Sequence, residues 1–168
     1  MKNGIVVADS GPIFSLAIIE RLDLLDLMFE EVKIPLAVWK EITFDKSQQF
    51  YQYIHDFFQY KIQEIESFNE LTFTMDYGES ESVILYKELN ANFLLIDDKK
   101  ARNIADYLEV NCIGTLGLLI ASKNTGFVKA LLPLFKKFYT NKRYYSPKLL
   151  NTILRQHNEK PFDFQSLL

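Results

Sequence analysis

The sequence has little of what most known catalytic and metal-binding motifs require. It contains one cysteine and two histidines among 168 residues, which excludes an internal disulfide and a cysteine–histidine metal cluster. It also has no glycine-rich phosphate loop, no Ser-His-Asp arrangement and no internal repeat. The single cysteine, Cys112, lies in the apolar stretch 110–113 and is expected to be a core residue.

Long hydrophobic runs are absent as well. The apolar run near the start, Ile5 to Ala8, stops at Asp9 and is too short for a signal peptide or a membrane span. The lone cysteine favours a reducing compartment. We therefore expect a cytoplasmic protein without a membrane partner.

Apolar residues are nevertheless plentiful. They make up 48% of the chain, which is enough for one compact domain with a sizeable core. We predict a single domain over residues 1–168, in which the two helical patterns across residues 127–158 form a C-terminal extension.

Charge is distributed unevenly along the chain. Residues 1–97 hold 7 Lys and Arg against 17 Asp and Glu, whereas residues 98–160 hold 12 against 4. Such polarity can guide a phosphate backbone toward an acidic site or pair subunits head to tail, although ordinary solvated helix surfaces explain it equally well. Together with the aromatic-rich helices, it leads us to expect a homodimer.

Strand-like and helix-like patterns alternate along the sequence. The strand-like runs lie at residues 4–8, 32–34, 60–65, 93–96 and 110–113, and helical patterns separate them. This alternation predicts an α/β fold with three layers, α/β/α, around a mainly parallel sheet of about five strands.

Two adjacent carboxylates end the most apolar of these runs. The stretch from Phe93 to Ile96 is followed by Asp97, Asp98 and a basic helical segment. Ligands of parallel sheets bind just beyond the carboxyl ends of the strands. One aspartate is explained as the cap of the following helix, so the other remains a candidate ligand.

Further carboxylates fall at the ends of other elements. Asp9 ends the first strand, and Ser10 is predicted to cap the next helix, which leaves Asp9 free. Glu41 lies near the end of a helix, where it opposes the helix dipole. Glu79 and Glu81 lie in a first helical turn, where the dipole favours acids; Glu79 faces the apolar side and Glu81 points less clearly inward.

In their order and spacing, these motifs resemble the PIN-domain nucleases, in particular a prokaryotic branch related to VapC-type toxins. The resemblance runs from Ile5 to about Ile120. It rests on four pieces: the strand followed by Asp9 and Ser10, Pro35-x-x-Val38-x-x-Glu41-Ile42, Gly78-Glu79-x-Glu81-x-Val83-Ile84, and Leu94 to Arg102 with Gly114-Thr115-Leu116-Gly117.

The resemblance implies a hydrolase, namely a Mg²⁺- or Mn²⁺-dependent endoribonuclease, and a role as the toxin of a toxin-antitoxin pair. Its catalytic carboxylates would be Asp9, Glu41, Glu79 and Asp98, and its metal ligands would come from Asp9, Asp98, Asp97 and Glu79. The partners would be RNA and an antitoxin protein.

Two positions depart from the family pattern or leave a choice. Ile96 stands where the family usually has Thr or Ser, which aligns Asp98 with the catalytic aspartate and makes Asp97 an added or substitute ligand. Glu79 fits the third acid, with Glu81 in reserve. Ser10 matches the small hydroxyl residue that follows the first aspartate.

The chemistry of such a site requires no nucleophilic side chain. Hard divalent ions take oxygen ligands, keep several waters and activate one of them for attack on phosphate. Lys99, Lys100 and Arg102 are candidates to bind the phosphate backbone, or form an ordinary solvated helix face. The alternative function is a catalytically weak or inactive PIN-like module that binds RNA or protein.

Overall fold

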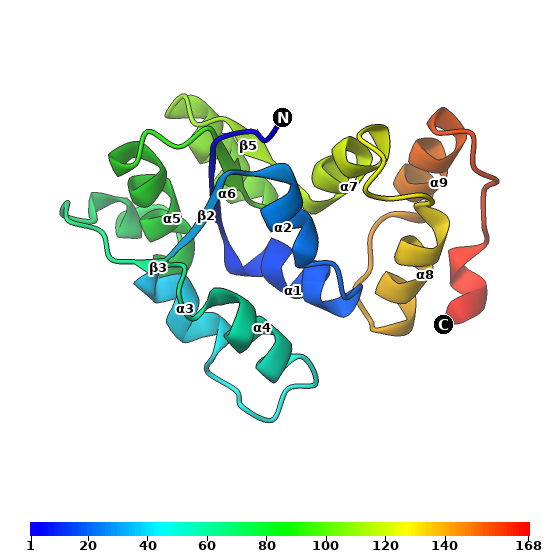
Figure 1. The fold of residues 1–168 in the computed structure, drawn as a ribbon, viewed down its shortest axis with the longest axis horizontal. Coiled ribbons are helices and arrows are strands. Elements are labelled where there is room, and N and C mark those ends of the chain that lie inside the picture. The colour runs from blue at the N-terminus through cyan, green and yellow to red at the C-terminus, as the bar shows by residue number, and fades with distance from the viewer.

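A computed structural model describes all residues, 1–168, and contains one sheet of five parallel strands (Figure 1). The spatial order is β3-β2-β1-β4-β5. The strands are β1 (Ile5–Ala8), β2 (Glu31–Pro35), β3 (Ile62–Gln63), β4 (Phe93–Leu95) and β5 (Cys112–Ile113). The predicted α/β class is confirmed, and every strand pair is parallel.

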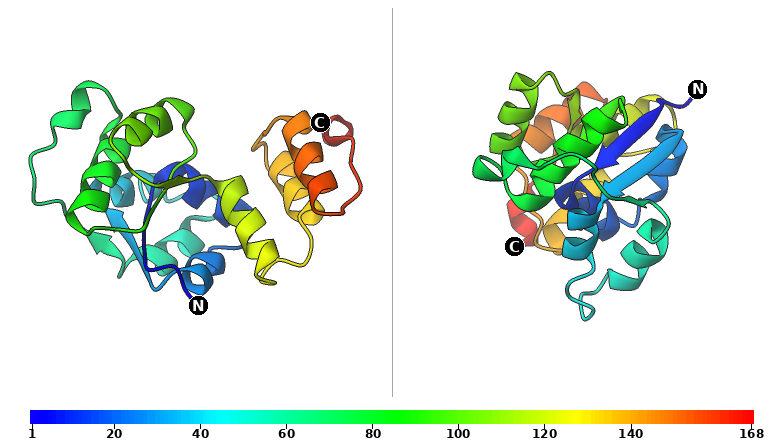
Figure 2. Two further views of the ribbon diagram at one scale, coloured as in Figure 1. Left: turned by 90° about the horizontal axis from the view of Figure 1, so that it is seen from above. Right: turned by 90° about the vertical axis from the view of Figure 1, so that its left-hand side faces the viewer.

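Helices connect the strands and cover both faces of the sheet; the right-hand view of Figure 2 shows β1 and β2 side by side. The α-helices are α1 (Ser10–Ile18), α2 (Asp23–Met28), α3 (Leu36–Ile42), α4 (Tyr51–Phe58), α5 (Tyr77–Glu88), α6 (Lys99–Tyr107), α7 (Thr115–Asn124), α8 (Leu132–Thr140) and α9 (Pro147–Gln156). Two short 3-10 helices, η1 (Glu70–Phe73) and η2 (Phe164–Leu167), complete the chain.

The sheet separates two hydrophobic cores. Val6 and Ala8 of β1 belong to a core of 29 buried residues, whereas Val7 belongs to one of 10 buried residues beneath α5 and α6. Successive side chains of a strand point to opposite faces, so both faces of β1 are apolar. This burial and the parallel pairing with β2 and β4 hold β1 in place, and with it the acidic residue that follows the strand.

The C-terminal helices extend the larger core. Phe135 of α8, Leu154 of α9 and Phe164 of η2 are fully buried in it. In Figure 1 these elements lie with α7 on the side of the molecule away from α3 and α5. They therefore pack beside the sheet layers and leave both sheet faces to the other helices.

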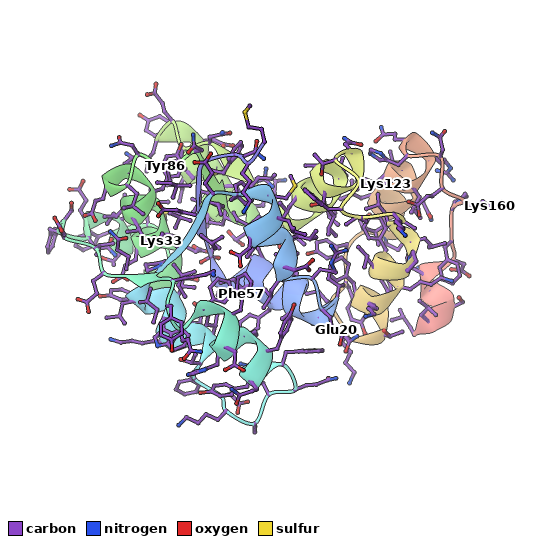
Figure 3. The ribbon with its side chains drawn as sticks, viewed as in Figure 1. Glu20, Lys33, Phe57, Tyr86, Lys123 and Lys160 are labelled. Atoms are coloured by element: carbon purple, nitrogen blue, oxygen red, sulfur yellow. The ribbon has the colours of Figure 1, made fainter.

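Glu159 follows α9 and connects this part of the chain to α7 and to the start of α8. Its carboxylate accepts hydrogen bonds from the Lys123 ammonium (2.7 Å) and from the backbone N–H groups of Leu131 (2.7 Å) and Leu132 (2.8 Å). Figure 3 labels Lys123 on α7 and Lys160, the neighbour of Glu159. Glu159 thus satisfies amides at the start of α8 that have no partner within the helix.

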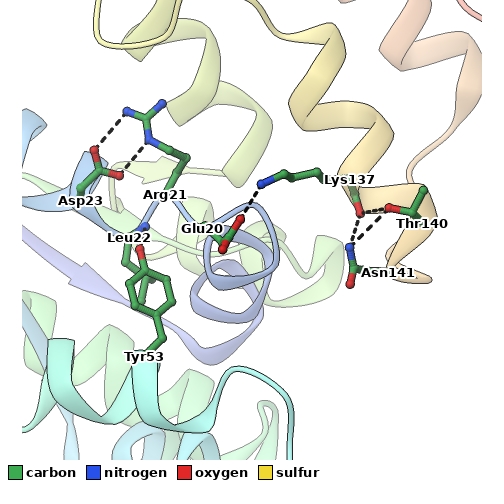
Figure 4. A network of polar contacts seen from close by, with 8 residues as sticks. All are labelled: Glu20, Arg21, Leu22, Asp23, Tyr53, Lys137, Thr140 and Asn141. Carbon is green, nitrogen blue, oxygen red and sulfur yellow. Dashed lines mark hydrogen bonds and ion pairs between the residues drawn. The ribbon is translucent and has the colours of Figure 1, made fainter.

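The loop after α1 makes a second connection, seen in Figure 4. Glu20 pairs with Lys137 of α8 (2.6 Å), and Leu22 N–H donates to the Tyr53 hydroxyl of α4 (3.0 Å). Glu20 itself has a positive φ of 57°. These contacts lie largely at the surface, so we expect them to contribute little to stability.

The edge strands are shorter than the sequence pattern predicts. The pattern across residues 60–65 forms only the two-residue β3, and that across 110–113 forms only β5. The pairing of β2 with β3 ends at Pro35 and Gln63, because α3 begins at Leu36 and leaves no further strand to pair with.

No helix has the length and apolar character needed to cross a membrane.

The contribution of Glu159 can be measured by the substitution Glu159→Gln. Although burial alone would raise its pKa, hydrogen bonds from Leu131, Lys123 and Leu132 hold the pKa of Glu159 below the usual value of 4.5. We expect Glu159→Gln to lower the free energy of unfolding by about 1–2 kcal/mol at pH 7, measured by urea denaturation.

The loss should depend on pH in a defined direction. A depressed carboxyl pKa stabilises the fold above pH 4.5, and this contribution disappears as the pH falls through the folded-state pKa. The difference between wild type and Glu159→Gln should therefore shrink in acid. The control Glu20→Gln, which breaks the exposed pair with Lys137, should cost at most about 0.5 kcal/mol; equal losses in the two variants would contradict the role of Glu159.

Candidate active site

Asp9 lies at the carboxyl edge of the sheet, directly after β1. Its backbone N–H donates to the carbonyl of Leu95 (2.9 Å), so the ends of β1 and β4 are adjacent. Its side chain is buried, and Oδ1 has no hydrogen-bond partner. A buried carboxylate oxygen without a partner is costly, which marks Asp9 as the centre of the candidate site.

The prediction that Ser10 caps the first helix is wrong. Asp9 itself occupies the N-cap position in an extended conformation, and Ser10 is already the first residue of α1, with no side-chain capping bond. The strand runs directly into the helix without an intervening turn. Ser10 is nevertheless buried, as is its neighbour in the sequence, Asp9.

The pKa of Asp9 is raised from 3.8 to about 7. Burial is the main cause, and the charges of Glu41 and Glu79 add to it, while the nearby amides of Ser10 and Gly11 partly oppose it. Asp9 thus holds a proton far more tightly than an exposed aspartate does.

Glu41 approaches Asp9 from the last turn of α3. A Cβ atom on Gly78 would lie 2.9 Å from Oε2 of Glu41 and 3.8 Å from Oδ1 of Asp9. The missing side chain of Gly78 therefore leaves the space into which both carboxylates point. The start of α5 closes the site from this side.

Glu79 is close enough to both Glu41 and Asp98 to be affected by their charges. Burial raises the pKa of Glu79, and the charges of Asp98, Asp76 and Glu41 raise it further. Its side chain also accepts a hydrogen bond from Asp76 N–H (3.3 Å) in a capping box at the start of α5. Glu79 is therefore placed by the helix cap as well as by its charged neighbours.

The two adjacent aspartates point to different partners. Asp98 caps α6 by accepting from Ala101 N–H (2.8 Å), and it lines a pocket of about 130 Å³ with Glu79. Asp97 instead accepts from the backbone N–H and the hydroxyl of Thr115, each at 2.7 Å. Asp98 thus stays with the acidic site, whereas both oxygens of Asp97 are engaged elsewhere.

Glu81 points inward, contrary to the sequence-based expectation. It is only 6% exposed and accepts a hydrogen bond from the backbone N–H of Ala37 (2.9 Å) at the start of α3. Because Glu81 holds the first turn of α3, it serves to position that helix. Glu79 therefore remains the candidate for the third acid.

The candidate phosphate-binding residues differ in their surroundings. Lys99 and Lys100 are exposed in the first turn of α6. Arg102 is partly buried, and its Nη1 lies 2.8 Å from the position that a Cβ of Gly114 would occupy. Arg102 therefore lies against the carboxyl edge of the sheet.

A divalent cation fits this donor set, although the side chains do not form a finished coordination shell. No group of three or more Asp, Glu, His or Cys side chains is arranged to hold a metal ion. Asp9 Oδ1 nevertheless lacks a partner and faces the same space as Glu41. An all-oxygen, open set of this kind fits a hard ion that keeps several water ligands.

A polar network at this edge was not expected from the sequence. Tyr145 and Arg143 each contact both Asp97 and Ser15 of α1. Tyr145 and Arg143 lie in the segment between α8 and α9, far from any motif. In the sequence, only the motif Gly114-Thr115 pointed to this network, because it contains Thr115, the hydrogen-bond partner of Asp97.

Replacing Asp9 should stabilise the protein in a pH-dependent way when no metal is present. The raised pKa means that the folded state binds the proton more tightly than the unfolded state, so wild-type stability falls as the pH rises from about 4 to about 7. Asp9→Asn lacks this effect. In EDTA, its gain in melting temperature over wild type should increase from pH 5 to pH 8 and reach about 5 °C.

Glu30→Gln is the matched control, because Glu30 is exposed and distant from the acidic cluster in the sequence. Its melting temperature should follow that of wild type at each pH. A gain for Asp9→Asn that does not vary with pH would refute the raised pKa.

Comparison with known proteins agrees with this architecture. A protein-family model described as PIN domain matches residues 5–159, which include the strands of the sheet, the acidic residues and the C-terminal helices α8 and α9. A comparison with curated proteins finds no match. The chain belongs to the PIN-domain family.

Proposed function

We propose that this protein is a Mg²⁺- or Mn²⁺-dependent endoribonuclease that hydrolyses single-stranded or loop RNA. PIN domains are generally nucleases, which supports hydrolase activity. The observation that carries the proposal is the buried Asp9, whose unpaired Oδ1 faces Glu41 at the carboxyl edge of a parallel sheet. Uncompensated burial of this kind is typical of functional sites.

The chain supplies charge and placement for this reaction. Asp9 is the best-supported direct ligand, and Glu41, Glu79 and Asp98 complete the set directly or through water. When bound, the cation supplies an activated water and neutralises charge on the phosphate. Without it, Asp9 retains a proton near neutral pH, because burial raises its pKa to about 7.

Asp97 is a weaker ligand candidate than the other four acids, because Thr115 occupies both of its oxygens. Lys99, Lys100 and Arg102 are proposed to bind the RNA backbone, since all three lie at the start of α6, directly after its N-cap Asp98.

Substitution of the acids should abolish cleavage while preserving the fold. We expect Asp9→Asn and Glu41→Gln each to reduce Mn²⁺-dependent cleavage of a mixed RNA pool by at least about 100-fold, because each removes charge that holds the cation. Glu30→Gln should cleave like wild type. Mn²⁺ should raise the melting temperature of wild type and of Glu30→Gln, but not that of Asp9→Asn.

Cleavage that survives EDTA or either acid substitution would indicate a contaminating nuclease. The alternative, a PIN-like module that binds RNA or protein without cleaving, draws support from the lack of a preformed group of three metal ligands. Binding of RNA by wild type without cleavage and without stabilisation by metal would favour that alternative.

Gly78→Ala tests the geometry of the site without altering any charge. The added methyl group would lie 2.9 Å from Oε2 of Glu41, so the flexible end of Glu41 must move away from Asp9. We expect cleavage to fall about 10-fold or more, while the melting temperature changes by only a few degrees, because alanine is favourable within a helix. Full activity in Gly78→Ala would show that Glu41 need not point into this space.

We further propose RNA as substrate, an antitoxin protein as partner, and a homodimer as the assembly. A small neighbouring reading frame that encodes a DNA-binding module would support the toxin role. Sedimentation that shows only monomer at micromolar concentration would reject the homodimer.

A further inference from the structure

The segment between α8 and α9 reaches the carboxyl edge of the sheet through Arg143. Its Nε donates to the Ser15 hydroxyl (2.9 Å), and its Nη2 donates to the carbonyl of Gly11 (3.1 Å). Gly11 lies two residues after Asp9 in the first turn of α1. The C-terminal extension therefore places a guanidinium against the first turn of α1, which directly follows Asp9.

Arg143 also lies beside Asp97. Its Nη2 is 3.8 Å from Oδ2 of Asp97, an ion pair that is longer than a hydrogen bond. Tyr145 donates to the same oxygen (3.4 Å). Thr115 already donates hydrogen bonds to both oxygens of Asp97 at 2.7 Å. The Asp97 carboxylate therefore orients Arg143 but does not occupy all of its N–H donors.

The guanidinium of Arg143 keeps free donors. An arginine has five N–H groups, and hydrogen bonds to Ser15 and Gly11 engage one on Nε and one on Nη2. The side chain is 35% exposed, so the remaining donors on Nη1 and Nη2 are available to a ligand.

Arg102 lies on the other flank of Asp97. A Cβ on Gly114 would be 2.8 Å from Nη1 of Arg102 and 3.1 Å from Oδ1 of Asp97. The Arg102 side chain makes no hydrogen bond or ion pair within the chain. Two guanidiniums thus flank one carboxylate, so these three side chains together carry one net positive charge next to the acidic site.

We infer that Arg143 binds a backbone phosphate of the RNA substrate, opposite Arg102, so that the C-terminal extension completes the substrate-binding edge. This inference rests on the proposed nuclease function. Guanidinium groups match phosphate oxygens in geometry and charge. A phosphate held here would lie beside the carboxylates that direct the cleavage.

The test measures RNA binding apart from cleavage. Binding of a fluorescent single-stranded RNA is measured in EDTA over a range of salt concentrations, for wild type, Arg143→Gln, Arg143→Lys and the control Arg155→Gln. Arg155 is exposed on α9 and makes no ion pair. Arg143→Gln should weaken binding about three- to ten-fold and reduce the slope of log K against log salt by about 0.7, the value for one phosphate on a single strand.

Arg155→Gln should bind like wild type, and Arg143→Lys should retain most of the slope because it keeps the charge. Melting temperatures identify a purely structural role: a lower melting temperature with an unchanged salt slope overturns the inference. Equal effects of Arg143→Gln and Arg155→Gln, or no RNA binding by wild type, also overturn it.

The outcomes separate this inference from the proposed function. If wild type cleaves RNA with Mn²⁺ but Arg143→Gln keeps the full salt slope, only the role of Arg143 fails. If the slope falls as expected but wild type never cleaves, only the nuclease function fails, and the edge remains an RNA-binding surface.

Discussion

The burial of one carboxylate at the end of β1 is the constraint on which the candidate site depends. Both faces of β1 are covered by apolar cores, and Asp9, which directly follows this strand, is itself only 6% exposed. Burial with an unpaired oxygen raises its pKa to about 7. A bound cation would offset both the cost of burying the Asp9 carboxylate and its repulsion from Glu41 and Glu79. Cation binding would therefore also stabilise the fold.

The first turn of α5 shapes this environment. Gly78 leaves space for Asp9 and Glu41, while Asp76 and Glu79 form the capping box that begins the helix. Glu81, two residues after Glu79, accepts a hydrogen bond from the amide of Ala37 at the start of α3. Because one helical segment provides space, a site acid and an anchor for α3, substitutions here should affect folding and activity together.

The C-terminal helices contribute to both stability and the site. Their aromatic side chains join the larger core, and Glu159 secures the start of α8. The connection between α8 and α9 then brings Arg143 and Tyr145 to Asp97. The uneven charge along the sequence thus corresponds in part to a physical arrangement, in which basic residues from the second half meet acids from the first.

The sequence alone determined the α/β class, the acidic ends of the strands and the family, because these follow from local periodicity and from motifs of a few residues. It placed Asp9 and Asp98 after two different strands, and the structure shows that these strands, β1 and β4, are neighbours. Only the tertiary structure decided that Asp97 turns to Thr115, that Glu81 is buried and that Arg143 reaches this edge. Each of these outcomes depends on a partner distant in sequence, whose position is set by packing and not by local pattern.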